Sequence, residues 1–354
     1  GLKKEFKNLF ILQLLWLRFV QFYLTIGFKF YYKKFNAIYL DEVPKDKAVI
    51  YLSNHQNALL DPLLITLKST RKNYFLTRAA VFKNPTIAKI LNSLQMLPVY
   101  RMIDGVDIRE KNKEIFTKSA ELLHKNKSII LFPEGSHDLK RRVRPLKKGF
   151  SRIIEETLQK YPTTDIVIIP IGVNYQSPTE YGDEITVYFG NHISPNKYWN
   201  DNNLDFNGIS NAVSIELKKL TTHIDPLNEY DEKLTKLKQL KVDFTNPVSV
   251  NDCLSKDFEY LGEKKNTNSK IYSIFKTLVK IFYFVPYLIW KKMAFPKVKE
   301  LEFLGTFRYA LIITLAPIYL SIAVIIFSIL FGKTIGLVVL LIGIILPLLT
   351  LKLK

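Results

Sequence analysis

The sequence has 354 residues, 48% of them hydrophobic, which is enough for one substantial domain or two small ones and excludes a fully disordered chain. The 51 lysines and arginines outnumber 32 aspartates and glutamates, and the resulting net charge of +19 implies an anionic partner: nucleic acid, a phosphate-bearing substrate or an acidic membrane. The single cysteine, Cys253, excludes an intrachain disulfide and a cysteine-based metal site, and indicates a reducing, cytosol-facing location.

Residues 1–40 are expected to form a helix at a membrane interface. The stretch is rich in leucine and aromatic residues, yet four polar side chains recur at three- and four-residue spacing and so share one helical face. They are Arg18, Gln21, Thr25 and Lys29. This pattern is typical of an amphipathic helix with its aromatic residues in the acyl boundary and its cations at the headgroups. A core helix docked on the globular domain is the alternative.

Residues 41–224 have the pattern of an α/β domain, because short β-rich apolar runs alternate with stretches of helical periodicity. The predicted strands are Ala48–Ser53, Tyr74–Thr77, Met96–Tyr100, Ser128–Phe132, Ile166–Val173 and Ile185–Phe189. The predicted helices are Lys111–Lys125, Gly149–Lys160 and Ile209–Thr222.

Two segments follow this domain. Residues 225–270 have little apolar periodicity, which predicts a linker or a loosely packed extension. Residues 271–308 begin with an aromatic, apolar stretch that Lys276, Lys280 and Pro286 interrupt. This pattern favours a second interfacial amphipathic segment over a membrane span.

Residues 309–354 predict a transmembrane helical hairpin. Tyr309–Phe331 contains no charge and, at about 1.5 Å per residue, is long enough to cross about 30 Å of hydrocarbon. Thr334–Leu351 is a second uncharged run, of 18 residues, which is at the short end of the spanning range, so a re-entrant hairpin is the alternative. Basic residues flank the outer ends of the hairpin and only Lys333 lies in its turn. The positive-inside rule therefore predicts an integral membrane protein with its globular domain in the cytosol.

A histidine and an aspartate follow the first predicted strand of the α/β domain. His55 comes directly after it, at the carboxyl end where α/β sheets present functional loops, and Asp61 lies six positions later. A neutral imidazole can accept a proton from an attacking hydroxyl, and a carboxylate can fix its tautomer and stabilise the imidazolium. The two residues fit a general base and its orienting acid. Taken alone, however, such a pair is common, and Asp61-Pro62 could be only a turn.

Two further segments carry candidate binding residues. Glu134, Gly135 and Ser136 follow the strand that ends at Phe132, so that a carboxylate sits on a tight turn with accessible backbone donors. Several basic residues come after them and suit a phosphate-bearing acceptor or the phosphates of a thioester carrier, although a solvated basic loop is the plainer interpretation. They are Lys140, Arg141, Arg142, Arg144, Lys147 and Lys148. The run Val99-Tyr100-Arg101 ends in a cation that could bind a phosphate through two hydrogen bonds.

Together and in this order these segments resemble the four sequence blocks of the glycerolipid acyltransferase superfamily, which includes lysophosphatidic acid and glycerol-3-phosphate acyltransferases. Block one is Asn-His, four residues and Asp; here five residues separate His55 from Asp61, so the turn before the helix must widen for the acid to reach the imidazole. Block two matches Val99-Tyr100-Arg101, and block three, Phe-Pro-Glu-Gly-Thr/Ser, matches Phe132 to Ser136. Block four, an apolar run with proline, matches Ile168 to Ile171.

The resemblance implies an α/β fold with a mixed sheet and flanking helices, and direct transfer of a fatty acyl group from acyl-coenzyme A or acyl carrier protein to a glycerolipid hydroxyl. His55 would be the base with Asp61 as its partner; Arg101 and Glu134 would position the acceptor's phosphate and glycerol. Gly135 and Ser136 complete the loop, and Lys147 or Lys148 would assist. No metal or organic cofactor is expected.

The first acceptor expected is 1-acyl-sn-glycerol 3-phosphate, which would give phosphatidic acid. Glycerol 3-phosphate, dihydroxyacetone phosphate or another lysolipid is the alternative, because Ser136-His137-Asp138 and Arg144 to Gly149 look more like the eukaryotic glycerol-3-phosphate branch. A non-catalytic membrane lipid-binding protein would share the charge and the hairpin. Nucleic acid is not an expected partner, since the basic residues are spread along the chain without a recognisable nucleic-acid module.

Overall fold

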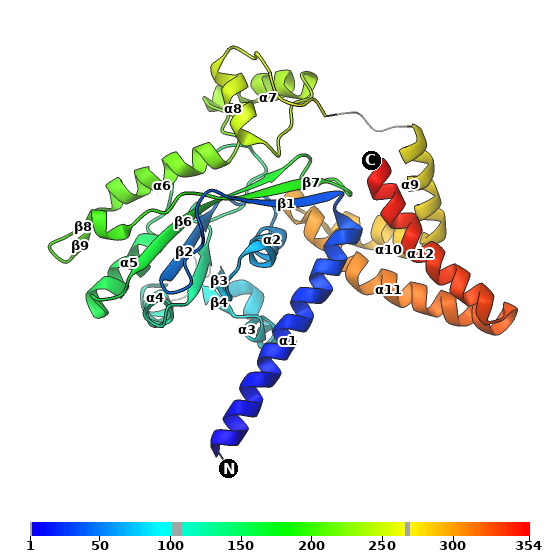
Figure 1. Ribbon diagram of the computed structural model, residues 1–354, viewed down its shortest axis with the longest axis horizontal. Coiled ribbons are helices and arrows are strands. Elements are labelled where there is room, and N and C mark those ends of the chain that lie inside the picture. Colours follow the sequence, from blue (N-terminus) through cyan, green and yellow to red (C-terminus); the bar gives the residue numbers. More distant parts are fainter. Residues whose placement is uncertain (1, 101–107, 266–269) are drawn as a thin grey trace.

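A seven-stranded sheet forms the centre of the computed structural model, which describes residues 2–100, 108–265 and 270–354 (Figure 1). Its strand order is β1-β7-β6-β2-β5-β3-β4. The strands are β1 Lys34–Tyr39, β2 Ala48–Ser53, β3 Asn73–Arg78, β4 Met96–Val99, β5 Ser128–Leu131, β6 Ile166–Tyr175 and β7 Glu184–Phe189. A separate two-stranded ribbon joins β8 Trp199–Asn200 to β9 Asn203–Leu204.

Strand direction confirms the mixed sheet that the sequence predicts. Strands β6, β2, β5, β3 and β4 pair in parallel, β7 runs antiparallel to β6, and β1 pairs in parallel with β7. In the register of β2 and β5, Leu52 lies opposite Leu131. The loops after these two strands therefore leave the sheet side by side, and one carries His55 while the other carries Glu134.

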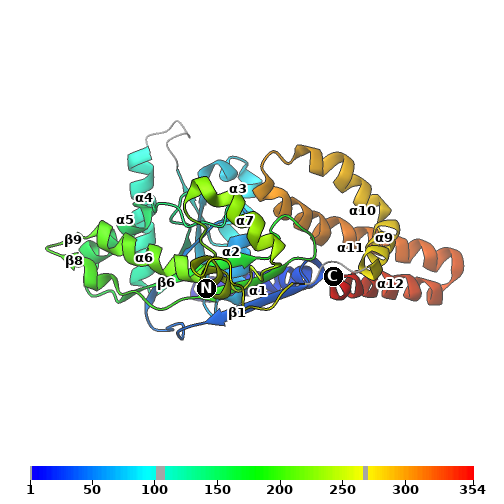
Figure 2. The same cartoon turned by 90° about the horizontal axis from the view of Figure 1, so that it is seen from above.

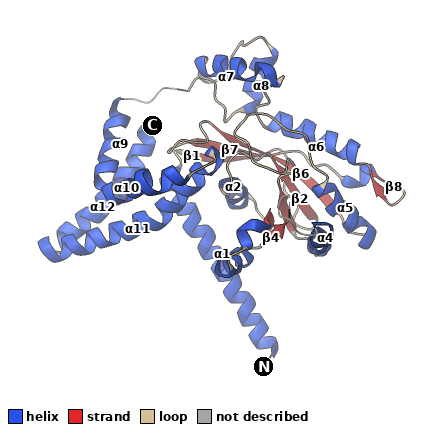
Figure 3. Cartoon of the chain, turned by 180° about the vertical axis from the view of Figure 1, so that it is seen from behind, coloured by secondary structure: helices blue, strands red, loops and turns tan. Residues whose placement is uncertain are grey.

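Helices cover both faces of the sheet (Figure 3). The buried strand β2 shows why, because Val49 and Tyr51 join an apolar cluster with α2 (Leu60–Lys68), whereas Ile50 and Leu52 join a second cluster on the other face. The second face packs against α4 (Ile108–His124), α5 (Gly149–Lys160) and α6 (Phe206–Leu220). A short helix α3 (Pro85–Ser93) precedes β4.

The N-terminal segment differs from the prediction at its end. Helix α1 spans Leu2–Tyr31, but Lys34–Tyr39 leaves it to form the edge strand β1, in which Asn36 lies opposite Thr186. The sheet therefore begins before the predicted boundary at residue 41. The short strand escapes detection because it follows a long apolar helix with only two residues between them.

Residues 225–270, expected as a linker or a loosely packed extension, form a small helical unit. They contain α7 (Tyr230–Gln239) and α8 (Pro247–Ser255), seen above the sheet in Figure 1. A small core lies between them and includes Ile224, Tyr230, Leu237, Val242, Phe244, Val250 and Cys253. The unit docks on the sheet through Gln176, whose Oε1 accepts a hydrogen bond of 2.8 Å from the Phe244 backbone N–H. Tyr230, Leu234 and Leu237 do lie at helical spacing, but α7 has only 10 residues, so the periodic pattern is too short to stand out in the sequence.

The remaining helices pack beside one end of the sheet domain (Figure 2). They are α9 (Lys270–Phe282), α10 (Phe284–Ile289), a π-helical turn (Trp290–Ala294), α11 (Leu304–Phe331) and α12 (Lys333–Leu353). Short 3-10 helices span Ala79–Phe82, Pro195–Tyr198, Leu227–Glu229, Phe295–Lys297 and Leu301–Phe303.

Three helices among the described residues are long and apolar enough to cross a membrane: Ile11–Tyr31, Leu301–Phe331 and Lys333–Leu353. The predicted C-terminal hairpin is therefore present as two such helices. The N-terminal helix, expected at the interface, also has the length and composition of a span. Helices α9 and α10 bend by 94° relative to each other and together could form one further broken span.

Prolines and tyrosines pair across these apolar helices. A proline lacks the N–H that would bond the carbonyl four residues earlier, and a free carbonyl is costly in an apolar medium. At three prolines, a tyrosine hydroxyl from another part of the helical bundle donates to that carbonyl. Tyr319 bonds the Phe282 carbonyl that Pro286 leaves free. Tyr23 bonds the Ile313 carbonyl before Pro317, and Tyr283 bonds the Gly343 carbonyl before Pro347.

Candidate active site

His55 and Asp61 are in contact at the carboxyl end of β2. The Nδ1 atom of His55 lies 2.8 Å from Oδ2 of Asp61. The Asp61 side chain is fully buried, whereas 13% of the His55 side chain is exposed. A carboxylate accepts a hydrogen bond from Nδ1–H, so Nε2 carries the lone pair that can accept a proton. This geometry is the one that a general base and its orienting acid require.

The turn between the two residues accommodates the extra residue. The backbone N–H groups of Gln56 and Asn57 donate to Asp61 Oδ2 at 2.7 and 2.8 Å. The Asn57 carbonyl in turn accepts from the N–H groups of Leu60 and Asp61 at 2.9 and 3.1 Å. The turn thus wraps around the carboxylate before α2 begins at Leu60, and Asp61 reaches the imidazole across five intervening residues.

Two residues that the sequence analysis did not select hold this pair. The Tyr175 hydroxyl, at the end of β6, donates to Asp61 Oδ1 at 2.6 Å, so that the carboxylate receives four hydrogen bonds in all. Asn54 forms two hydrogen bonds with the Val173 backbone, of 3.0 and 2.8 Å, and fixes the end of β2 to β6. Asn54 belongs to the Asn-His motif and could have been chosen from it. Tyr175 carries no such signal.

The loop after β5 lies beside His55. The Phe132 ring stacks on the imidazole with centroids 3.9 Å apart and an interplanar angle of 16°. The Glu134 carboxylate is 5% exposed and pairs with Arg144, whose Nε donates to it at 2.8 Å. Arg144 Nη1 also donates to Ser136 Oγ at 2.8 Å. Arg144 therefore fixes the shape of the loop. In the sequence it is only one member of a basic cluster.

Gly135 and the two lysines complete this loop. Gly135 has φ +77°, a conformation that residues with a Cβ rarely adopt, and an added Cβ would meet the Lys147 side chain at 3.3 Å. The Lys147 backbone N–H donates to the Pro133 carbonyl at 2.7 Å, which places the start of α5 against the loop. The Lys147 and Lys148 side chains are exposed. Arg101, the cation expected from block two, lies outside the described residues.

Positive charge also lies close to His55 and Asp61. A small cavity beside His55, about 10 Å³ in volume, is lined by Lys140, Arg141 and Arg142 together with Glu134. Burial lowers the pKa of Arg141 to about 10, which leaves it cationic at neutral pH. Burial also raises the pKa of Glu134, and the Arg144 guanidinium opposes that rise. The site is therefore suited to an anionic ligand.

The first turn of α11 and the segment before it pack on the turn between His55 and Asp61. The Thr306 hydroxyl accepts from the Leu59 backbone N–H at 3.2 Å, and the Phe303 ring lies edge-on to His137 with centroids 5.0 Å apart. His137 Nε2 lies 3.6 Å from Glu300 Oε2. These two residues and Glu302 have ligand atoms within 4.8 Å of one another, a spacing that could hold a cation. The expectation that no metal takes part stays a prediction.

Comparison with known proteins identifies the domain that carries this site. The acyltransferase family model matches residues 34–174, so this part of the chain is an acyltransferase-family domain. The chain is 30% identical over 119 residues to the chloroplastic 1-acyl-sn-glycerol-3-phosphate acyltransferase BAT2 of Brassica napus, which covers 33% of each chain. It is 34% identical over 80 residues to glycerol-3-phosphate O-acyltransferase 1 of Saccharomyces cerevisiae, which covers 22% of this chain and 10% of that one.

The crystal structure of the 1-acyl-sn-glycerophosphate acyltransferase PlsC from Thermotoga maritima resembles 52% of this chain and 69% of its own, with 18% identity and a TM-score of 0.38. The chain spans only 33% of the length of the Brassica napus relative. Residues 34–174 thus form a domain of the acyltransferase family, and the curated relatives named here are glycerolipid acyltransferases.

Proposed function

We propose that this protein transfers a fatty acyl group from a thioester carrier to the hydroxyl of a phosphate-bearing glycerolipid precursor. The observation that carries the proposal is the 2.8 Å contact between His55 Nδ1 and the buried Asp61 carboxylate, on a loop beside the Glu134 loop. The family membership of residues 34–174 supports the same reaction class.

The reaction would proceed by direct transfer. His55 Nε2 accepts the proton of the acceptor hydroxyl while that oxygen attacks the thioester carbonyl carbon. A carbon–oxygen bond forms, the carbon–sulfur bond breaks, and the leaving thiolate takes the proton from His55. Asp61 stabilises the imidazolium in between, and no covalent acyl-enzyme is needed. Neither a metal nor an organic cofactor is required for this sequence of steps.

The acceptor would bind over the basic surface beside His55. Lys147 and Lys148 are exposed next to the Glu134 loop, and both can contact a phosphate. Glu134 and Ser136 are bonded to Arg144, so their role is to shape the loop that receives the glycerol. The donor is acyl-coenzyme A or acyl carrier protein. The apolar helices would anchor the protein in a membrane, with the basic domain on the cytosolic side.

The first candidate acceptor is 1-acyl-sn-glycerol 3-phosphate, the substrate in the name of the Brassica napus relative. Glycerol 3-phosphate is the second candidate, because the yeast relative is a glycerol-3-phosphate O-acyltransferase. A non-catalytic lipid-binding protein is the alternative from a different class, and an activity assay separates it from both.

The test measures free thiol release from a long-chain acyl thioester by the protein in detergent, with each acceptor in turn. We expect acceptor-dependent release that His55→Ala abolishes. His192→Ala is the matched control, because His192 is exposed and its backbone N–H bonds Asp41 rather than a residue of the His55 loop. Release that persists in His55→Ala would refute the mechanism. No release with any acceptor in the wild-type protein would favour the lipid-binding alternative.

A further inference from the structure

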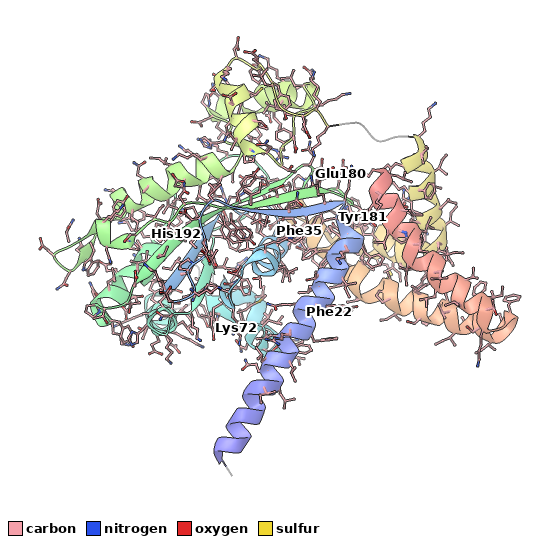
Figure 4. The ribbon with its side chains drawn as sticks, viewed as in Figure 1. Phe22, Phe35, Lys72, Glu180, Tyr181 and His192 are labelled. Atoms are coloured by element: carbon pink, nitrogen blue, oxygen red, sulfur yellow. The ribbon has the colours of Figure 1, made fainter. Side chains whose placement is uncertain are left out.

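A second and much larger cavity lies between the apolar helices and the end of the sheet domain. Its volume is about 610 Å³, within the range of about 300–1,000 Å³ that is usual for small-molecule sites. Residues of α1, α9, α10, α11 and α12 line it, together with Thr179, Glu180 and Tyr181 of the sheet domain. Figure 4 labels Glu180 and Tyr181 where the domain faces these helices. His55 does not line this cavity.

The cavity is polar at one end and apolar at the other. At the domain end it is lined by Arg308, Thr179 and Lys276, and Arg308 Nη1 donates to the Thr179 carbonyl at 3.0 Å. Leu320 lies twelve residues beyond Arg308 on α11, or about 18 Å along the helix, and lines the other end with Ile344. The walls thus match a molecule with a polar head and a long apolar tail.

The proline–tyrosine pairs build the apolar walls. Tyr23, Tyr283, Pro317 and Pro347 all line the cavity. The Tyr23 hydroxyl donates to the Ile313 carbonyl and the Tyr283 hydroxyl to the Gly343 carbonyl. These hydroxyls and carbonyls therefore already have hydrogen-bond partners. An apolar chain can therefore lie against these walls without leaving the two proline-freed carbonyls unsatisfied.

The charge at the polar end is an excess of cations. Lys276, Lys280 and Arg308 line the cavity, and no ion pair between residues in the described ranges joins any of them to a carboxylate. Each cation instead lies over an aromatic ring, at 5.5, 5.2 and 5.2 Å from Tyr272, Tyr287 and Trp290. The one carboxylate in the wall, Glu180, is paired with Lys354 at 2.9 Å. The three cations line one cavity, and an anion among them would relieve their mutual repulsion.

We propose that this cavity binds an anionic phospholipid of the bilayer, with its phosphate at Lys276, Lys280 and Arg308 and an acyl chain between α11 and α12. The helices that form the walls are candidate membrane spans, so the occupant enters from the bilayer. The site is separate from His55, and binding to it does not depend on acyl transfer.

Helix α11 contacts both the cavity and the turn between His55 and Asp61. Thr306 bonds the Leu59 backbone, and Arg308, two residues further, lines the cavity. A lipid phosphate at Arg308 would therefore fix the first turn of the same helix that packs on the catalytic loop. Bound lipid would join the apolar helices to the acyltransferase domain.

Trp290 offers a direct probe, because it lines the cavity and the chain has two other tryptophans, Trp16 and Trp199. In a Trp16→Phe/Trp199→Phe background, the protein is reconstituted into phosphatidylcholine vesicles with increasing small fractions of phosphatidylglycerol brominated on its acyl chains. Bromine quenches indole fluorescence at short range. We expect quenching that saturates at a low fraction of the anionic lipid, whereas brominated phosphatidylcholine should quench in proportion to its amount.

The charge variants test the headgroup contact. Lys276→Gln/Lys280→Gln should weaken the saturable binding on the order of tenfold, because each basic residue near an anionic lipid contributes a several-fold gain. Lys291→Gln/Lys292→Gln is the matched control, since these two exposed lysines lie in the next segment and do not line the cavity. An equal loss in both double variants would mean general surface attraction and would overturn the proposal.

Two further arms decide the occupant. Stronger quenching by a brominated lysophosphatidate would make the cavity an acceptor site, and stronger quenching by a brominated acyl-coenzyme A would make it a donor-chain site; either result overturns the proposal. Ala316→Phe fills the cavity from α11 without removing a charge. It should abolish the saturable component, and unchanged binding in this variant would contradict the assignment. Native mass spectrometry of the wild-type protein should show one retained anionic phospholipid per chain.

Discussion

Replacing Asp61 with asparagine isolates the charge of the catalytic pair from its geometry. Oδ2 of Asp61 accepts from His55 Nδ1 and from the backbone N–H groups of Gln56 and Asn57. An amide nitrogen cannot take that position, because it would face three donors. The asparagine carbonyl oxygen must therefore occupy it, and the NH₂ group must point to Tyr175, whose hydroxyl can rotate to accept. His55 keeps its tautomer in Asp61→Asn, and only the negative charge is lost.

The magnitude follows from the lost attraction between the carboxylate and the imidazolium. Two unit charges about 4 Å apart at an effective dielectric constant of about 20 interact by about 4 kcal/mol. At about 1.4 kcal/mol for each tenfold change in rate, kcat should fall by about 10³-fold. The KM for the acceptor should stay close to the wild-type value, because Asp61 is fully buried behind His55.

The assay is steady-state thiol release at saturating acceptor, with kcat and KM measured separately. Asp205→Asn is the matched control: Asp205 caps α6 by accepting from Gly208 N, and asparagine caps a helix equally well. This control should leave kcat unchanged. A wild-type kcat in Asp61→Asn, or a rise in KM with no loss of kcat, would refute the reasoning.

Three further predictions follow from individual contacts. Tyr175→Phe removes one of the four hydrogen bonds to Asp61. A single hydrogen bond to a charged group is worth about 1.5–3 kcal/mol, and only part of it acts specifically in the transition state. The kcat should therefore fall less than in Asp61→Asn. Burial raises the pKa of Asp183 to about 7 from 3.8, so its contribution to stability is lost as pH rises through that window. The melting temperature of the wild-type protein should therefore fall relative to Asp183→Asn between about pH 4 and about pH 7, and equal slopes would contradict the shift. Tyr283→Phe frees the Gly343 carbonyl and should lower the free energy of unfolding in detergent by about 0.6–2 kcal/mol, measured against Tyr287→Phe, whose hydroxyl makes no hydrogen bond to the described residues.

The core of the α/β domain was predictable because its signals are local. Helix α5 is found over the predicted range Gly149–Lys160, since Phe150, Ile153, Ile154 and Leu158 are buried at helical spacing. The strands β2, β5 and β6 are continuous buried apolar runs, and their predicted ranges agree with the structure to within two residues. Strong periodicity or a buried run identifies an element without knowledge of its neighbours.

The elements that were missed depend on distant partners. Strand β1 is exposed at four of its six positions and is fixed by pairing with β7, about 150 residues later. The unit of α7 and α8 is held by a small core whose members come from separate short segments. Neither has a periodic pattern strong enough to stand alone, because tertiary contacts rather than local preference decide their structure.

The same distinction separates the site residues. His55, Asp61 and Glu134 could be selected because each lies in a short motif after a buried strand. Tyr175 lies 114 residues from Asp61 and touches it only because β2 and β6 are neighbours in the sheet. Arg144 was one cation in a basic run, and the structure distinguishes it by its bonds to Glu134 and Ser136. Motif spacing predicts the candidate reacting groups, whereas the residues that position them are identified only by their tertiary contacts.

The turn between His55 and Asp61 packs directly against α11, one of the candidate membrane spans. A Cβ added to Gly305 would lie 2.9 Å from both Asn57 Oδ1 and Leu60 Cδ1, so α11 approaches the turn as closely as a glycine allows. The Asn57 side chain is held from the other side, because its Nδ2 donates to the Pro178 carbonyl at 3.0 Å. The turn that supplies two donors to Asp61 is thus clamped between α11 and the sheet domain. Because Asn57 N is one of those donors, we expect a shift of α11 relative to the domain to disturb the hydrogen bonds of the Asp61 carboxylate.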